Sequence, residues 1–153
     1  MFIPNRQFIK DLAINTSSTS TPSYSTMCTA SEINIDTDFE SKSFYVFCDA
    51  LERTILTGGS FGLSGTIKFD TSNEGEKALL DRVHTFIASG TIAQFNNIDV
   101  QYKLLESDTN GVLTYTTYNA NGTLVLSDLG GAAEDETEFG FEFKQNGVAT
   151  VVT

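Results

Sequence analysis

The sequence predicts a mainly β domain, in which two packed antiparallel sheets form a β-sandwich or partial barrel with one flanking α-helix. Three observations predict this class. Apolar and polar residues alternate in several segments, which is the period of a half-buried strand. Only one segment has helical spacing. The chain also has 12 Phe but no Trp and only 2 Pro. Its 153 residues are enough for a single domain with one core. We expect an N-terminal strand and flexible polar arm over residues 1–26, and one β domain over residues 27–153.

The first strands lie in the N-terminal part of the chain. A short strand is expected from Phe8 to Ile14. The polar stretch after it, residues 15–26, is rich in Ser and Thr and is expected to be a loop or arm. Residues 32–38 then alternate between an apolar side and a wet, acidic side, as a half-buried strand does. The polar side carries Glu32, Asn34, Asp36 and Asp38.

A polar segment, residues 36–43, is expected to connect this strand to the next one at Phe44–Phe47. Two more strands are expected at residues 54–57 and 61–69, separated by two glycines. The outer face of the later strand carries small residues, which would let another group approach closely.

One helix is expected over about residues 74–88. Asn73 is a good N-cap, and Glu76 stands at the position that a capping box requires. Gly90 follows the last turn, where glycine commonly ends a helix. The helix is expected to lie on the sheet through one apolar stripe, which contains Leu79, Val83, Phe86 and Ile87.

The remaining chain is expected to form hairpins. Alternation from Ile98 to Leu104 predicts a strand, and three Asn-Gly pairs predict tight turns, because these residues accept positive φ. The turns are at residues 110–111, 121–122 and 146–147, and the strands between and after them are at 113–118, 123–126, 139–143 and 149–152. In the late strand, Phe139, Phe141 and Phe143 share one face, and Glu138 and Glu142 share the other.

The charge excludes several partners. Nine Lys and Arg against twenty Asp and Glu give a net charge of −11, which opposes binding to nucleic acid by counterion release and docking on anionic lipid. The N-terminus has no pattern of a signal peptide, and no apolar run is long enough to span a membrane. Cys28 and Cys48 fit no metal or redox motif, so two reduced thiols are expected rather than a disulfide.

The residue inventory does not support an enzyme. The chain has one histidine, His84, which is expected to be an ordinary side chain of the helix, so a nucleophile–histidine arrangement has only one available base. The glycine-rich segment 58–62 lacks the Lys-Ser/Thr of a phosphate-binding loop. Asp108 and Asn110 resemble the start of a calcium loop, but the bidentate Glu is missing. No catalytic residue, metal or cofactor is therefore expected.

The order of elements resembles that of the tail tube proteins (major tail proteins) of long-tailed bacteriophages. The resemblance rests on segments that match in order and composition. They are Ile33–Glu40, Leu51–Ile55, Phe61–Asp70, the helix that begins at Glu74, and the acidic and then aromatic ending over residues 134–147. Together they span about residues 28–153.

The resemblance implies a structural virion protein. Its relatives form hexameric rings that stack into a tube around a tape-measure protein, and this tube later conducts DNA. It implies self-association, contact with tape-measure, tail terminator and baseplate or tip proteins, and passage of DNA without specific binding. It also implies a place in the virion tail after assembly in the host cytoplasm, with no membrane insertion.

A negatively charged lumen would repel the phosphates of the passing DNA. We expect the lumen to be lined by the polar face of the early strand, Glu32, Asn34, Asp36 and Asp38, and by Glu138 and Glu142 of the late one. The resemblance also implies that a long loop between strands bridges successive rings. We expect this loop within the polar segment 36–43, chiefly at Asp38, Phe39, Glu40, Ser41, Lys42 and Ser43. The N-terminal arm, residues 1–26, is the second expected bridge.

A second interpretation is a β-sandwich module that binds carbohydrate or protein. Such a module would need an exposed aromatic platform, and Tyr115 and Tyr118 are the candidates, although Tyr115 is expected to pack inside.

Overall fold

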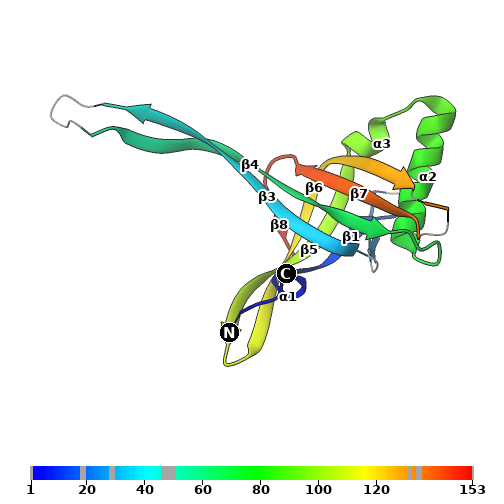
Figure 1. Cartoon of the computed structure of the whole chain (residues 1–153), viewed down its shortest axis with the longest axis horizontal. Coiled ribbons are helices and arrows are strands. Elements are labelled where there is room, and N and C mark those ends of the chain that lie inside the picture. Colours follow the sequence, from blue (N-terminus) through cyan, green and yellow to red (C-terminus); the bar gives the residue numbers. More distant parts are fainter. Residues whose placement is uncertain are drawn as a thin grey trace.

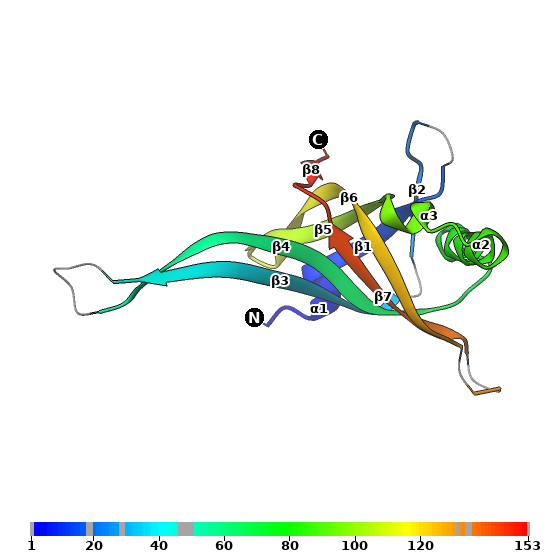
Figure 2. The same ribbon diagram turned by 90° about the horizontal axis from the view of Figure 1, so that it is seen from above.

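We analysed a computed structural model, which describes residues 2–17, 20–27, 30–45, 51–130, 132–133 and 136–152. Strands dominate it, and a long hairpin extends from the body, with a helix at the other end of the longest axis (Figures 1 and 2). The elements are α1 (Asn5–Phe8), β1 (Ile9–Asn15), β2 (Tyr24–Thr26), β3 (Ala30–Phe44), β4 (Arg53–Lys68), α2 (Glu74–Ser89), α3 (Ala93–Asn96), β5 (Ile98–Thr109), β6 (Val112–Gly130), β7 (Glu138–Gln145) and β8 (Thr150–Val151).

The strands form one antiparallel sheet in the order β2-β1-β5-β6-β7-β4-β3, and β8 pairs with β6. The predicted mainly β class with a flanking helix is confirmed. The strands that we expected in two sheets are joined by hydrogen bonds into a single curled sheet, because β6 is long enough to pair with β5 along one part and with β7 along another. The result is a partial barrel.

The core lies inside the curl. It is lined by β1 and β5 on one side and by β4 and β7 on the other, with Phe139, Phe141 and Phe143 of β7 all buried, as the alternation predicted. Burial of this apolar surface is the main stabilising contribution, at roughly 25 cal/mol per Å². The other fully buried large side chains of the core include Ile9, Leu63, Ile67 and Ile98.

Strands β3 and β4 form a hairpin much longer than predicted. We expected residues 36–43 to be a connecting loop, and that prediction is wrong, because they continue β3 and pair with β4. Gly58 and Gly59 do not separate two strands either. They lie within β4, where they pair with Glu40 and Phe39 of β3. A Cβ at Gly59 would lie 2.9 Å from a ring carbon of Phe39, so glycine there makes room for the ring. Residues 46–50, which include the second half of the strand expected at Phe44–Phe47, lie outside the described part of the chain.

Strands β5 and β6 form a second projecting hairpin. Its turn is at Asn110-Gly111, and both residues have positive φ, 54° and 84°, as predicted for this pair. The second predicted turn, at Asn121-Gly122, is wrong, because both residues lie within β6. Gly122 serves a different purpose, since a Cβ there would overlap the carbonyl oxygen of Lys144 in the neighbouring strand. The third turn is confirmed at Gly147, with φ 76°, and leads to β8.

Helix α2 has almost the predicted bounds, and Gly90 ends it in the left-handed conformation. Asn73 makes no side-chain cap hydrogen bond, so the predicted capping box is wrong; Glu76 is instead fully buried. Arg82 donates a 3.1 Å hydrogen bond to the carbonyl oxygen of Asn15, and the N-terminal half of the helix packs closely on the body. Gly75 allows this contact, because a Cβ there would lie 2.7 Å from the sulfur of Met27. The predicted apolar stripe is buried at Leu79 but exposed at Phe86 and Ile87.

The N-terminal part of the chain contributes to the body. Strand β1 pairs with β5, and its Ile9, Leu12 and Ile14 are buried. After a polar loop, β2 pairs with the end of β1. Both cysteines, and with them the predicted free thiols, lie outside the described residues. Within the described ranges, no helix has the length and apolar character to cross a membrane.

Candidate functional site

The six residues predicted to line a lumen lie on one face of the sheet. Partners that lie directly across antiparallel strands share a face. Asn34 of β3 lies across from Ser64 of β4, which in turn lies across from Glu142 of β7. Glu138 reaches the same face through its pairing with Lys68. The strand alternation thus brings Glu32, Asn34, Asp36, Asp38, Glu138 and Glu142 together, and we call this surface the acidic face.

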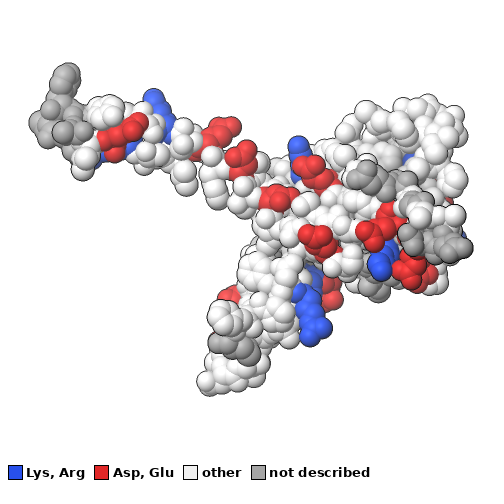
Figure 3. Space-filling model, in the orientation of Figure 1, with Lys and Arg blue, Asp and Glu red and all other residues white. Residues whose placement is uncertain are grey.

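The acidic face is strongly negative. Glu40 also belongs to it, so six carboxylates share the face with two lysines, Lys68 and Lys144. Lys144 Nζ lies 3.6 Å from Glu142 Oε1, and Lys68 Nζ lies 3.2 Å from Glu136 Oε2. Both ion pairs are exposed and contribute little to stability. Figure 3 shows the acidic side chains in a row along the hairpin and onto the body.

Short side chains occupy the middle of the acidic face. Strand β4 places glycines, serines and a threonine between the carboxylates of β3 and β7, so a shallow furrow of about 250 Å³ runs there. Gly62 is required by packing as well, because a Cβ would collide with the carbonyl oxygen of Phe143. This surface offers charge and hydroxyl groups. The short β4 residues of the acidic face are Gly58, Ser60, Gly62, Ser64 and Thr66.

Aromatic side chains support the acidic face from behind. Phe61 of β4 stacks on Tyr102 of β5 with 6.0 Å between ring centroids, and Tyr102 lies 5.7 Å from the ring of Tyr118. Burial of the Tyr102 phenol, with a smaller contribution from Tyr118, raises the pKa of Tyr102 to about 12. The packing joins opposite walls of the partial barrel and fixes the position of β4 relative to β5.

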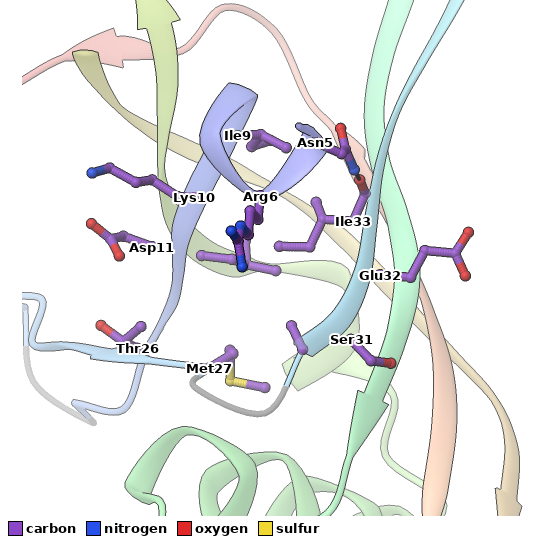
Figure 4. Close-up of a pocket in the computed structure, with 12 residues that line it drawn as sticks. Asn5, Arg6, Ile9, Lys10, Asp11, Thr26, Met27, Ser31, Glu32 and Ile33 are labelled. Atoms are coloured by element: carbon purple, nitrogen blue, oxygen red, sulfur yellow. Dashed lines mark hydrogen bonds between the residues drawn. The ribbon is translucent and has the colours of Figure 1, made fainter. Parts of the chain in front are cut away.

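The curled sheet is open between β1 and β3. A pocket of about 280 Å³ lies there, and Arg6, Ile9, Met27 and Ile33 are among its lining residues (Figure 4). The side-chain amide of Asn5 donates a hydrogen bond of 2.7 Å to the carbonyl oxygen of Ile33. In the described part of the chain, β4 is the only strand that pairs with β3, so the other edge of β3 keeps backbone groups that a further strand can bind.

The six residues predicted for the inter-ring loop, residues 38–43, lie on the outer part of β3 rather than in a loop. Around them the hairpin carries large apolar side chains that are exposed, such as Phe39 at 61% and Leu56 at 65%. Leu56 lies across from Ser41, on the face of Phe39, whereas Ile55 lies across from Lys42 on the other face. The hairpin end is therefore apolar on both faces. We use that name for Phe39, Phe44, Tyr45, Leu51, Ile55 and Leu56.

Sequence reasoning missed most of the hairpin end. Residues 54–57 were expected in a strand, but their exposure was not. The signal that could have identified these exposed residues is the pair Ile55-Leu56. Two adjacent apolar residues break the alternation there, next to polar residues in the sequence. The exposed end of α2 was also missed, because its spacing is that of an ordinary packed helix.

Neither candidate residue of the second interpretation is a fully exposed aromatic side chain. Tyr115 and Tyr118 are both half-buried. The hydroxyl of Tyr115 donates a 2.7 Å hydrogen bond to the carbonyl oxygen of Gln7, and Lys10 Nζ lies 4.0 Å from its ring centroid. Among the described residues, no group of three or more His, Cys, Asp or Glu is arranged to hold a metal ion.

Comparisons with known proteins agree with the architecture. A scan of family models and a search of curated proteins found no match. Among solved structures, a chain in the tail of an empty gene transfer agent particle with C6 symmetry is similar, with a TM-score of 0.58 and 14% identity. A chain in the virion of the native gene transfer agent particle has a TM-score of 0.53 and 12% identity, and in both cases the match covers 94% of this chain and 96% of the other.

The third similar chain is in the sheath–tube complex of an extracellular contractile injection system, PVC, in its extended state. Its TM-score is 0.54 and its identity is 13%, over 98% of this chain and 92% of that chain. Each of the three matches covers at least 92% of both chains, so the likeness concerns the whole fold. This chain therefore has the tail tube fold, as the order of elements in its sequence predicted.

Proposed function

We propose that this protein is the subunit of a phage tail tube, in which hexameric rings stack into a hollow channel. The observation that carries the proposal is the acidic face, which lies on the same sheet as the unpaired edge of β3. In this role the protein is structural rather than enzymatic and belongs to the virion tail, after assembly in the host cytoplasm. Its partners are copies of itself, the tape-measure protein, and the tail terminator and baseplate or tip proteins.

The strand directions are suitable for ring closure. Strands β6, β7, β4 and β3 are consecutive and antiparallel, so β3 runs opposite to β6. Rotation about a ring axis would place β3 of one copy beside β6 of the next in antiparallel orientation. Beyond Gly122, β6 pairs with β7 but has no second partner strand among the described residues. Pairing of these two edges would close a continuous barrel and remove the exposed edges.

Closure in this way would turn the acidic face toward the channel. The excess of carboxylates over lysines would then be repeated around each ring, and a narrow channel focuses such a field. DNA phosphates would be repelled from the wall, and the short side chains of β4 would offer little surface for adhesion. The hairpin end would lie away from this channel wall and reach the next ring, as predicted for the segment 38–43.

The first test is whether the purified protein polymerises. Concentrated wild-type protein should form hollow rods in negative-stain images. A variant with residues 40–58 replaced by Asn-Gly removes both strands of the outer hairpin, and it should keep the circular dichroism spectrum of the wild type but form no rods. Rods of normal length from the shortened variant would reject the bridging role.

The second test addresses the acidic face. The change Glu32→Lys together with Asp36→Lys should produce rods that retain short double-stranded DNA at low salt, whereas wild-type rods should retain none. The matched control is Asp81→Lys with Glu106→Lys, which makes the same charge change at exposed positions elsewhere. Equal DNA retention by the two double variants would remove the acidic face from the channel.

A further inference from the structure

The outer end of α2 and the start of α3 form a second exposed apolar surface. Ile87 is 74% exposed, Ile92 is 54% exposed and Phe86 is 45% exposed. The ring of Phe86 meets that of Phe95 edge-on, with 6.5 Å between centroids, so α3 is held against α2. We call Phe86, Ile87 and Ile92 the helix patch. Grouped apolar residues of this exposure on a surface usually mark an interaction site.

The helix patch and the hairpin end lie at opposite ends of the molecule. Figures 1 and 2 show the hairpin and α2 at the two extremes of the longest axis in both views. Two different surfaces at opposite ends form a head-to-tail contact when copies are stacked, and contacts of that type continue from copy to copy. Because both faces of the hairpin end are apolar, a single neighbour that covers one face would leave the other face exposed to water.

The end of α2 offers partial negative charge to a cation of the hairpin. The last turn of α2 contains no basic residue, although the carbonyl end of a helix carries partial negative charge. Gly90 binds one of these carbonyl oxygens, that of Phe86, at 2.8 Å. The hairpin end brings Lys42, which lies across from Ile55 on the same face. An ammonium group there would complement the end of α2.

We propose that the helix patch of one copy receives the hairpin end of a second copy in the next ring. The proposal rests on the proposed function and adds to it the surface where the hairpin lands. Ile55 would cover Phe86 and Ile87, and Lys42, which lies on the same face of the hairpin, would lie near the end of α2. Each copy would thus donate a hairpin at one end and receive one at the other.

The test uses exposed substitutions, so that the body of the protein stays folded. Ile87→Asp places a charge in the proposed contact, and Thr85→Asp places the same charge on the opposite side of α2, where Thr85 is also exposed. We expect Ile87→Asp to lower the fraction of protein that sediments as rods by at least about tenfold, because the contact would bury an unpaired charge. Thr85→Asp should assemble like the wild type.

A charge pair identifies the partner surface. Ile55→Lys should restore rod formation to the Ile87→Asp variant, whereas Ile55→Asp should not. Restoration by lysine alone would support the contact. Normal assembly of Ile87→Asp, or no difference between the two double variants, would overturn the inference even when wild-type rods form. Failure of the wild type itself to form rods would instead reject the proposed function.

Discussion

The two hairpins of this protein project from the same body but end differently. The β3/β4 hairpin ends in six large apolar side chains, whereas the β5/β6 hairpin ends in an Asn-Gly turn flanked by Ser and Thr, with Val112 as its exposed large apolar residue. The hydroxyl groups of Ser107 and Thr114 bond to each other, and that of Thr116 donates to a carboxylate oxygen of Glu106. The hairpins show that projection alone does not identify an interface; the side chains at the tip do.

The bases of the hairpins are alike. Each has a glycine where a neighbouring strand comes close, Gly62 in β4 and Gly122 in β6. Each also contributes to the aromatic packing, through Phe61 and Tyr102. The bases therefore stabilise the fold, and the difference between the hairpins is confined to their ends.

The largest effect is expected when the end of one hairpin is given the chemistry of the other. Changing Phe39, Phe44, Ile55 and Leu56 together to Thr should abolish rod formation, because the apolar contact between copies is lost. These residues are at least one-third exposed, so the free energy of unfolding, measured by denaturant titration, should change little. Rods from this variant would show that the apolar hairpin end is not needed for assembly.

A glycine at the base should matter to stability instead. Gly122→Ala should lower the free energy of unfolding by about 1–3 kcal/mol, the usual cost of overpacking, because the added Cβ would overlap the carbonyl oxygen of Lys144. Gly58→Ala is the matched control: its Cβ would lie 3.8 Å from the nearest atom, Glu40 Oε2. Equal urea midpoints for the two variants would contradict the close approach.

A change at the tip of the polar hairpin should have almost no effect. Val112→Asp alters a side chain that is 65% exposed, and exposed substitutions of this kind usually stay within about 0.5 kcal/mol. We expect unchanged rods and an unchanged melting temperature. Loss of rods in this variant would give the two hairpins equal roles and so remove the distinction between them.

A further effect concerns pH and the packing that joins the bases. The folded state raises the pKa of Tyr102 to about 12, whereas an unfolded tyrosine titrates near about 10. The folded state therefore holds this proton more tightly. Its stabilising contribution is complete below about pH 10 and is lost as the pH rises toward about 12. Urea titrations at a series of pH values should show a shallower loss for Tyr102→Phe, and parallel curves would argue against burial of the phenol.

The sequence predicted the body better than the hairpins. Alternation correctly located the half-buried side of β3 at Ile33 and Ile35 and the buried faces of β5 and β7. The turn at Asn110-Gly111 has the positive φ that this residue pair accepts. Asn121-Gly122 is the same residue pair but lies within β6, where the close approach of the neighbouring strand β7 requires the glycine. Local sequence cannot distinguish these two uses of glycine.

The candidate site shows the same limit. Period-two spacing placed the acids of β3 on one face, but only the pairing of β4 with β7 brings Glu138 and Glu142 to that face. The polar residues 36–43 were expected in a connecting loop, because the segment is polar and the family resemblance implies a long bridging loop there. These residues instead continue β3 beyond the body, where neither face of the strand is buried by its own chain. They form a strand because β4 pairs with them, and residues 36–43 alone do not reveal this pairing.

The stripe of short side chains along β4 has a consequence for transport. Between the carboxylates of β3 and β7 it leaves a furrow that large side chains do not fill. In a channel built from such surfaces, a layer of bound water and mobile counterions would separate a passing polyanion from the protein. Friction against the wall would then depend on the salt in the channel more than on the sequence of the cargo.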